Sequence, residues 1–266
     1  PGAAGTNTWG ILQATTGSLT VKSGTLNLIG GANGAKTGGV EIPGGTLTVA
    51  GGTLNSTAGL YNYTQGHGTL NISGGSYNFT GSEFLNGYST LGNINLSGTG
   101  VFNVNLLRVS QAAAGSVINL DGGTLIFSRF NSASGVGTVN FNGTTIQCKS
   151  SVSSPTSFLP VNASYSYIMQ LGGVSINTEG YSIFIGTNFI SDPNLGGYPD
   201  GGLTEDGMNG TIIMTSSSTN SYTGPTTVLN GTLSLSQPSL SAVSPVVLAT
   251  NSVIGTNSIV NLNFTG

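Results

Sequence analysis

The amino-acid sequence predicts an all-β protein, a right-handed parallel β-helix with three short strands in each coil of about 21–24 residues. Three observations lead to this prediction. A phrase of the form Gly-Thr-Leu-polar-apolar recurs, as in GGTLTVAGG at 44–52 and HGTLNISGG at 67–75. Glycines follow each phrase where a sharp corner would need them, and no long segment has the 3.6-residue period of a helix. A fixed period of this length is typical of solenoids, in which each unit buries its apolar face against its neighbours.

The first strand of each coil carries two apolar residues separated by one polar residue, so the apolar pair shares one face. The first apolar residues are Leu26, Leu47, Leu70, Ile94, Ile118 and Val139, and the second are Leu28, Val49, Ile72, Leu96, Leu120 and Phe141. The polar residues between them are Asn27, Thr48, Asn71, Asn95, Asn119 and Asn140. We expect the apolar columns inside the helix and the polar column outside.

A second strand follows a glycine-rich corner in each coil, and a weaker third strand completes the triangle. The second strands place Leu54, Tyr77, Phe102 and Leu125 inward, followed by Ser56, Phe79, Val104 and Phe127. The third strands are expected near 40–42, 60–62, 83–85 and 107–109. Proline is rare in this part of the chain, as hydrogen-bonded strands require.

Composition limits the function. Only 5% of the 266 residues are charged, against about 25% in an ordinary domain. The net charge of −3 does not favour nucleic acid. Cys148 is the only cysteine, which excludes an internal disulfide and predicts a small buried side chain. No apolar run is long enough for a transmembrane segment.

The period changes along the chain and predicts three regions. Regular coils occupy 1–147, irregular coils and loops continue the solenoid over 148–202, and a further repeat occupies 203–266. Four carboxylates, Asp192, Asp200, Glu205 and Asp206, fall within fifteen residues of the middle and last regions. Their spacing matches no known calcium loop, so a solvated acidic loop is the main expectation and a Ca²⁺ site the alternative.

The stretch 201–236 resembles the autotransporter-associated β-strand repeat, also called the passenger-associated transport repeat. The matching residues are Gly202, Leu203, Thr204, Gly207, Gly210, Thr211, Ile213, Asn220, Tyr222, Thr223, Gly224, Thr226, Val228, Gly231, Thr232 and Leu233. Two residues depart from the pattern at expected corners: Glu205 stands where the family usually has Lys, and Pro225 where a second Gly is common. The match covers about 35 residues directly, and the Gly-Gly-Thr-Leu coils before it resemble those of large secreted repeat proteins. The resemblance implies export to a bacterial surface and a β-helical stalk or passenger.

Candidate sites for chemistry are sparse. Glu83, Arg108 and Arg129 recur at about the same offset in successive coils, which predicts either an exposed ion pair or a small charged site, with the ion pair favoured. Tyr61, Tyr63 and Tyr88 are the best candidates for surface contacts to a ligand, because alternation does not place them in the core. We assign no catalytic residue, no metal ligand and no cofactor.

These observations predict a secreted, non-enzymatic structural protein of a bacterial cell surface: a stalk, a fibre subunit or an adhesin passenger segment. Exposed strand edges without a capping helix favour assembly of copies head to tail. Surface glycans are the other partner considered. The alternative function is a carbohydrate-binding or polysaccharide-active β-helix, which would need acids and bases gathered on one face.

Overall fold

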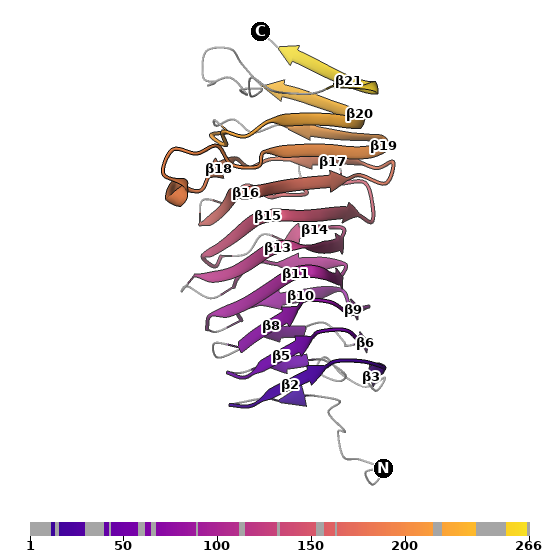
Figure 1. The fold of residues 1–266 in the computed structure, drawn as a ribbon, viewed down its shortest axis with the longest axis vertical. Helices are drawn as coiled ribbons and strands as arrows, with labels where there is room; N and C mark the ends of the chain where they lie inside the picture. The colour runs from indigo at the N-terminus through magenta and orange to yellow at the C-terminus, as the bar shows by residue number, and fades with distance from the viewer. Residues whose placement is uncertain are drawn as a thin grey trace.

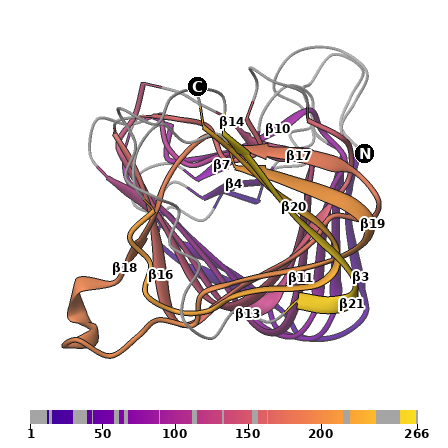
Figure 2. The same ribbon diagram turned by 90° about the horizontal axis from the view of Figure 1, so that it is seen from above.

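A computed structural model describes residues 12–13, 16–29, 40–42, 44–57, 62–64, 68–88, 90–111, 115–131, 134–152, 157–162, 164–214, 220–237 and 254–264. These residues form a parallel β-solenoid, which confirms the predicted fold class (Figure 1). The strand pairs within this part of the chain are parallel, and the longest stack runs through ten successive strands, from β2 to β21. Seen along the axis, the strands line the sides of each coil (Figure 2).

Each coil has three faces. The first face contains β2 (Ser18–Val21), β5 (Thr46–Val49), β8 (Gly68–Ile72), the first halves of β11 (Gly92–Asn103), β13 (Ser116–Phe127), β15 (Gly137–Cys148) and β16 (Tyr165–Asn177), and β18 (Phe189–Ser191). The second face contains β3 (Thr25–Ile29), β6 (Thr53–Thr57), β9 (Ser76–Phe79), the second halves of β11, β13, β15 and β16, and the first halves of β19 (Leu203–Met214) and β20 (Thr226–Gln237).

The third face begins as a separate sheet. It contains β1 (Leu12–Gln13), β4 (Val40–Ile42), β7 (Asn62–Thr64), β10 (Glu83–Asn86), β12 (Leu106–Arg108) and β14 (Arg129–Asn131). Residues 157–159, β17 (Ser182–Ile185) and the second halves of β19 and β20 continue it. The last strand, β21 (Ile254–Phe264), pairs with β20.

The corner that a long strand turns changes partway along the stack. In β11, β13 and β15 one continuous strand turns the corner between the first and second faces, and in β19 and β20 one strand turns the corner between the second and third. The earlier corner takes a glycine such as Gly122, whose φ of 96° lies in the left-handed region. Between β18 and β19 the chain leaves the coil through a 3₁₀ turn, η1 (Pro193–Leu195). The corner between the second and third faces therefore carries a different set of residues in the later coils.

The predicted inward columns are confirmed from the second coil onward, but the prediction for the first coil is wrong. Leu19 pairs with Leu47, and Leu26 pairs with Leu54 on the second face. The first coil is therefore 28 residues long. Leu19 and Val21 have the same apolar spacing as Leu26 and Leu28, so alternation alone cannot decide which pair belongs to which face.

Aromatic side chains stack along the axis inside the solenoid. Phe84 of the third face meets Tyr77 and Phe102 of the second face edge to face, with ring centroids 6.0 and 5.2 Å apart. Further along, Phe127 meets Phe130 at 4.7 Å and Phe158 at 4.8 Å. Such pairs add about 0.5–1.5 kcal/mol each to the apolar area they bury. The side chain of Cys148 is buried in the same core, as predicted, and burial raises the pKa of its thiol to about 12, which leaves it unreactive.

Two ladders of carboxamides run along the outside of the solenoid. On the first face, the side chain of each Asn donates to the oxygen of the corresponding side chain in the preceding coil, at 2.7–3.4 Å. The members are Thr48, Asn71, Asn95, Asn119 and Asn140. On the second face the ladder is Asn27, Asn55, Asn78 and Asn103, and Lys149 Nζ donates to the last oxygen at 3.0 Å. Both ladders hold neighbouring coils in one register.

Replacing Asn95 by Ala is expected to lower the free energy of unfolding by about 1–3 kcal/mol, because two ladder bonds are lost and each contributes about 0.5–1.5 kcal/mol. Urea denaturation followed by circular dichroism measures this loss. Asn93→Ala is the matched control, since Asn93 lies two residues earlier on the same strand and takes part in none of the described ladder bonds. Equal losses in the two variants would show that the ladder adds nothing specific.

Candidate functional site

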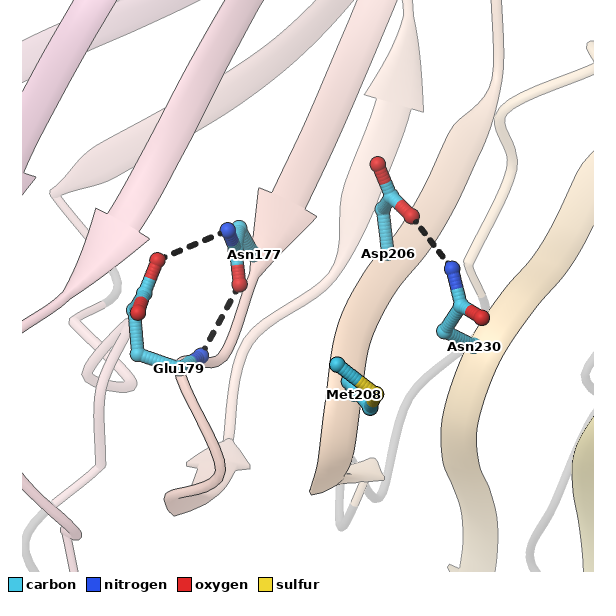
Figure 3. A pocket seen from close by; sticks show the side chains of 5 residues that line it. All are labelled: Asn177, Glu179, Asp206, Met208 and Asn230. Carbon is cyan, nitrogen blue, oxygen red and sulfur yellow. Dashed lines mark hydrogen bonds between the residues drawn. The ribbon is translucent and has the colours of Figure 1, made fainter.

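A pocket of about 390 Å³ opens on the outer surface at the corner between the second and third faces (Figure 3). It spans three successive coils, because its lining comes from β16, β19, β20 and the turn after β16. Asn177 ends β16, and Glu179 follows in the turn. Asp206 and Met208 lie on β19, and Asn230 lies on β20. The pocket therefore depends on the stacking of these coils.

Glu179 is fixed on one side of the pocket by three hydrogen bonds. Its Oε1 accepts from Asn177 Nδ2 at 2.8 Å and from Gln147 Nε2 at 3.0 Å, and its own N–H donates to Asn177 Oδ1 at 2.9 Å. Its φ of 52° is in the left-handed region, which costs energy for a residue with a side chain. The surrounding bonds hold this conformation and direct the carboxylate.

Asp206 and Met208 form the other side. Asp206 Oδ1 accepts from Asn230 Nδ2 at 2.8 Å. The register between β19 and β20 shifts on either side of Asp206, and Met208 lies on the bulging segment with 71% of its surface exposed. Asn209 follows with a φ of 64°. Glu179 and Asn209 are the two residues other than glycine with positive φ in the described part of the chain, and both lie at this corner.

The pocket is acidic. The groups beside its two carboxylates are uncharged. Its described lining holds two carboxylates, two carboxamides and one thioether, and no lysine or arginine is among these residues. Carboxylate and carboxamide oxygens accept hydrogen bonds, and the carboxamides also donate. Within the described residues, no group of three or more His, Cys, Asp or Glu side chains is arranged to hold a metal ion. The arrangement suits a neutral or cationic ligand and repels an anionic one.

Glu205 lies on the inner side of the same wall, one residue before Asp206. Its side chain is 1% exposed, and its neighbours in register are Ile176 and Val228. Oε1 accepts from the N–H of Gly207 at 3.2 Å and from Thr178 Oγ1 at 3.4 Å, whereas Oε2 is buried and has no hydrogen-bond partner among the described residues. Burial raises the pKa of Glu205 to about 7, against the opposing effect of these hydrogen bonds.

The prediction of a solvated acidic loop is wrong for two of its four residues. Glu205 is inside the solenoid in a strand rather than at a corner, and Asp200 is 3% exposed. Asp200 accepts from the backbone N–H groups of Gly202, Gly224 and Thr223 at 2.7–3.0 Å, so it joins the corners of two coils. Asp206 is exposed. The sequence contained a signal for Glu205, since alternation from Leu203 places it inward.

Asp192 caps the 3₁₀ turn. Its Oδ1 accepts from the N–H of Asn194 at 2.9 Å, and its Oδ2 accepts from Gln170 Nε2 at 2.9 Å. The bond from Asn194 is the main cause that lowers the pKa of this carboxyl. The four acids therefore have separate partners, and they do not form a common site.

The charged residues of the third face form a network that differs from the expected exposed pair. Glu83 is 6% exposed, and Arg108 Nε and Nη2 donate to its two oxygens at 2.9 and 2.7 Å. Asn131 Nδ2 also donates to Glu83 Oε1 at 2.6 Å, and Arg108 Nη1 donates to Gln111 Oε1 at 2.7 Å. Arg129 lies in the same column as Glu83 two coils later and takes no part in these bonds. The internal partners are those of a structural ion pair.

Of the three tyrosines predicted as surface contacts, the structure describes the side chain of Tyr88 alone, and Tyr88 is not among the residues that line the pocket. Tyr88 follows β10 and is 46% exposed, so it remains a candidate for a surface contact. The backbone of Tyr63 lies in β7, while its side chain and all of Tyr61 lie outside the described residues. No pattern in the sequence indicates a role for Asn177, Glu179, Met208 or Asn230. Of the pocket residues, only Asp206 belongs to the acidic stretch 192–206 that the sequence marks.

The residues of the repeat motif at 201–236 have partners within the solenoid. Asn220 Oδ1 accepts from the N–H of Phe189 at 2.8 Å, and the hydroxyl groups of Tyr222 and Thr226 are 2.6 Å apart. The ring of Tyr222 meets that of Phe189 edge to face. Pro225 contacts Gly202 of the preceding coil through its backbone. In this chain the motif fixes one coil upon another.

The chain matches no known family model, no curated protein and no solved structure. The β-helical repeat architecture is consistent with the resemblance noted in the sequence, and membership of that repeat family remains a proposal. Among the described residues, none of the helices has the length and apolar character needed to cross a membrane.

Proposed function

We propose that this chain is an extracellular structural segment of a bacterial surface protein: a β-helical stalk, a fibre subunit or the passenger part of an adhesin. The observation that supports this most is the direction of its polar groups. The ladder residues, Asp200 and the motif residue Asn220 hydrogen-bond to neighbouring coils, and the ring of Tyr222 packs against Phe189 of the preceding coil. Side chains used in this way stabilise a rod and leave few groups for chemistry.

A rod of this kind suits a spacer, because each coil adds about 4.8 Å along the axis and repeats the same contacts. Low charge and abundant Ser, Thr and Asn give it a polar surface with little electrostatic attraction for nucleic acid. The motif at 201–236 supports export to a cell surface as part of the same proposal. Copies of the chain joined end to end would extend the rod without a new type of contact.

Electron microscopy of the cells that produce the chain, after labelling with an antibody to it, tests this proposal. We expect label outside the cell, on rods or fibres. Continuous fibres would identify a fibre subunit that assembles end to end, whereas separate rods attached to cells would identify a stalk or passenger. Label confined to the cell interior would contradict the proposal.

A further inference from the structure

We propose that the pocket lined by Asn177, Glu179, Asp206, Met208 and Asn230 binds a neutral sugar residue. This inference is independent of the structural role, since a stalk can exist with or without a binding site. The pocket volume of about 390 Å³ is within the range of about 300–1,000 Å³ that is usual for small-ligand sites. It is the size of the pocket together with the chemistry of its lining that points to a sugar.

The two carboxylates each keep one oxygen for a ligand. Glu179 Oε1 and Asp206 Oδ1 accept hydrogen bonds from carboxamides of the protein, while Glu179 Oε2 and Asp206 Oδ2 take part in none of the described hydrogen bonds. In Figure 3 the Asn177–Glu179 pair and the Asp206–Asn230 pair stand on either side of the pocket. Hydroxyl groups of a sugar donate readily to such fixed, charged acceptors.

The remaining groups suit the other parts of a sugar. The Asn230 carboxamide donates to Asp206 and retains its oxygen as an acceptor. Met208 lies below Asp206 on the same strand in Figure 3, and its exposed, polarisable side chain offers a surface to the C–H face of a sugar ring. Among the described residues the lining holds no lysine or arginine and carries two negative charges, which disfavours the anionic sialic and uronic acids as ligands.

The pocket is also built before a ligand arrives. The bonds to Glu179 hold its backbone in the left-handed region, and Asn209 adopts the same uncommon conformation beside Met208. Conformations that cost energy occur preferentially at ligand sites, where the surrounding structure maintains them. Less ordering is then required on binding.

Saturation-transfer NMR and calorimetry with the methyl glycosides of glucose, galactose, mannose and N-acetylglucosamine test the proposal, with sialic acid as the anionic comparison. We expect at least one neutral glycoside to bind with a Kd on the order of 1–10 mM, as befits a monosaccharide. Sialic acid is expected not to bind. Failure of all four neutral glycosides to bind overturns the proposal.

Two variants locate the site. Asp206→Ala is expected to weaken binding about tenfold or more. Asp121→Ala is the matched control, because Asp121 also accepts from an asparagine at a corner, Asn142, but lies outside the pocket. The control is expected to bind like the original chain. Equal binding by Asp206→Ala, or a dependence of binding on added Ca²⁺ that EDTA abolishes, overturns the proposed direct contact between carboxylates and sugar.

Discussion

Glu205→Gln is expected to stabilise the protein by on the order of 3 kcal/mol at about pH 8 and by less than about 1 kcal/mol at about pH 5. Glu205 is buried with one oxygen unpaired, so its charged form costs free energy in the folded state. Gln keeps the acceptor that Gly207 and Thr178 use and carries no charge. The variant therefore removes the ionisation and keeps the packing.

The sign of the pH dependence follows from the direction of the shift. Folding raises the pKa of Glu205 from its ordinary 4.5 to about 7. Below about pH 4.5 the carboxyl is protonated in both the folded and the unfolded state, so its ionisation takes nothing from the free energy of unfolding. Between these values the unfolded chain releases its proton first, so stability falls as the pH rises, and above about pH 7 the loss is complete.

The titratable groups near Glu205 do not cause a similar change of stability between about pH 4.5 and about pH 7. Asp206 is adjacent, and its charge contributes to the raised pKa. Burial, with the charges of Glu179 and Glu205, raises the pKa of Cys148 from 9.0 to about 12. The thiol therefore loses no proton below about pH 8. The lowered pKa of Asp192 affects stability only below its ordinary value of 3.8, where protonation removes its contribution.

Thermal or urea unfolding at about pH 5 and about pH 8 measures the effect, and hydrogen exchange shows whether it is confined to β19 and β20. Asp121→Asn is the control, because Asp121 is exposed and its removal is expected to leave the decline with pH in place. If Glu205→Gln declines between the two pH values as steeply as the original chain, another group causes the dependence.

Gly202→Ala is expected to destabilise the protein by about 4 kcal/mol or more, the largest loss that we predict. The φ of Gly202 is 71°, where a side chain costs about 1–2 kcal/mol. A Cβ at this position would also overlap the carbonyl oxygen of Pro225 in the next coil. That oxygen accepts from the N–H of Leu203, so it cannot move away without breaking a bond between coils.

Gly196→Ala separates the two effects. Gly196 has a φ of 61°, but nothing lies within 4 Å of where its Cβ would be. Gly196→Ala is expected to lower the free energy of unfolding only by the conformational cost of about 1–2 kcal/mol. Urea denaturation compares the variants, and the yield of soluble protein gives a second measure if Gly202→Ala does not fold. Equal losses would show that the contact between coils contributes nothing.

The sequence predicts the fold well because a solenoid repeats its pattern. Alternation places Tyr77 and Phe102 in the core, and both are buried. It fails where two segments have the same pattern, as for Leu19 and Leu26, because only the pairing of strands assigns each to a face. Interior strands of one solenoid differ little in sequence, so their order along the chain does not settle the register.

The candidate site is less predictable for a different reason. Glu179 and Asp206 lie 27 residues apart in a chain whose coils vary in length. After β16 the long strands turn the corner between the second and third faces instead of the corner between the first and second. No local pattern marks that change. Glu205 was expected in a solvated loop because charged residues are seldom fully buried, although its position two residues after Leu203 indicates the inner face.

The carboxamide ladders have one further consequence, which is electrical. Each asparagine donates toward the N-terminal coil and turns its carbonyl oxygen toward the next, so the amide dipoles of a ladder point the same way and polarise one another. A ladder therefore resembles an α-helix in having a positive first end and a negative last end. Lys149 stands at the negative end of the second-face ladder, on Asn103, as a cation does at a helix C-terminus. A rod in which only 5% of the residues are charged therefore has a dipole along its axis.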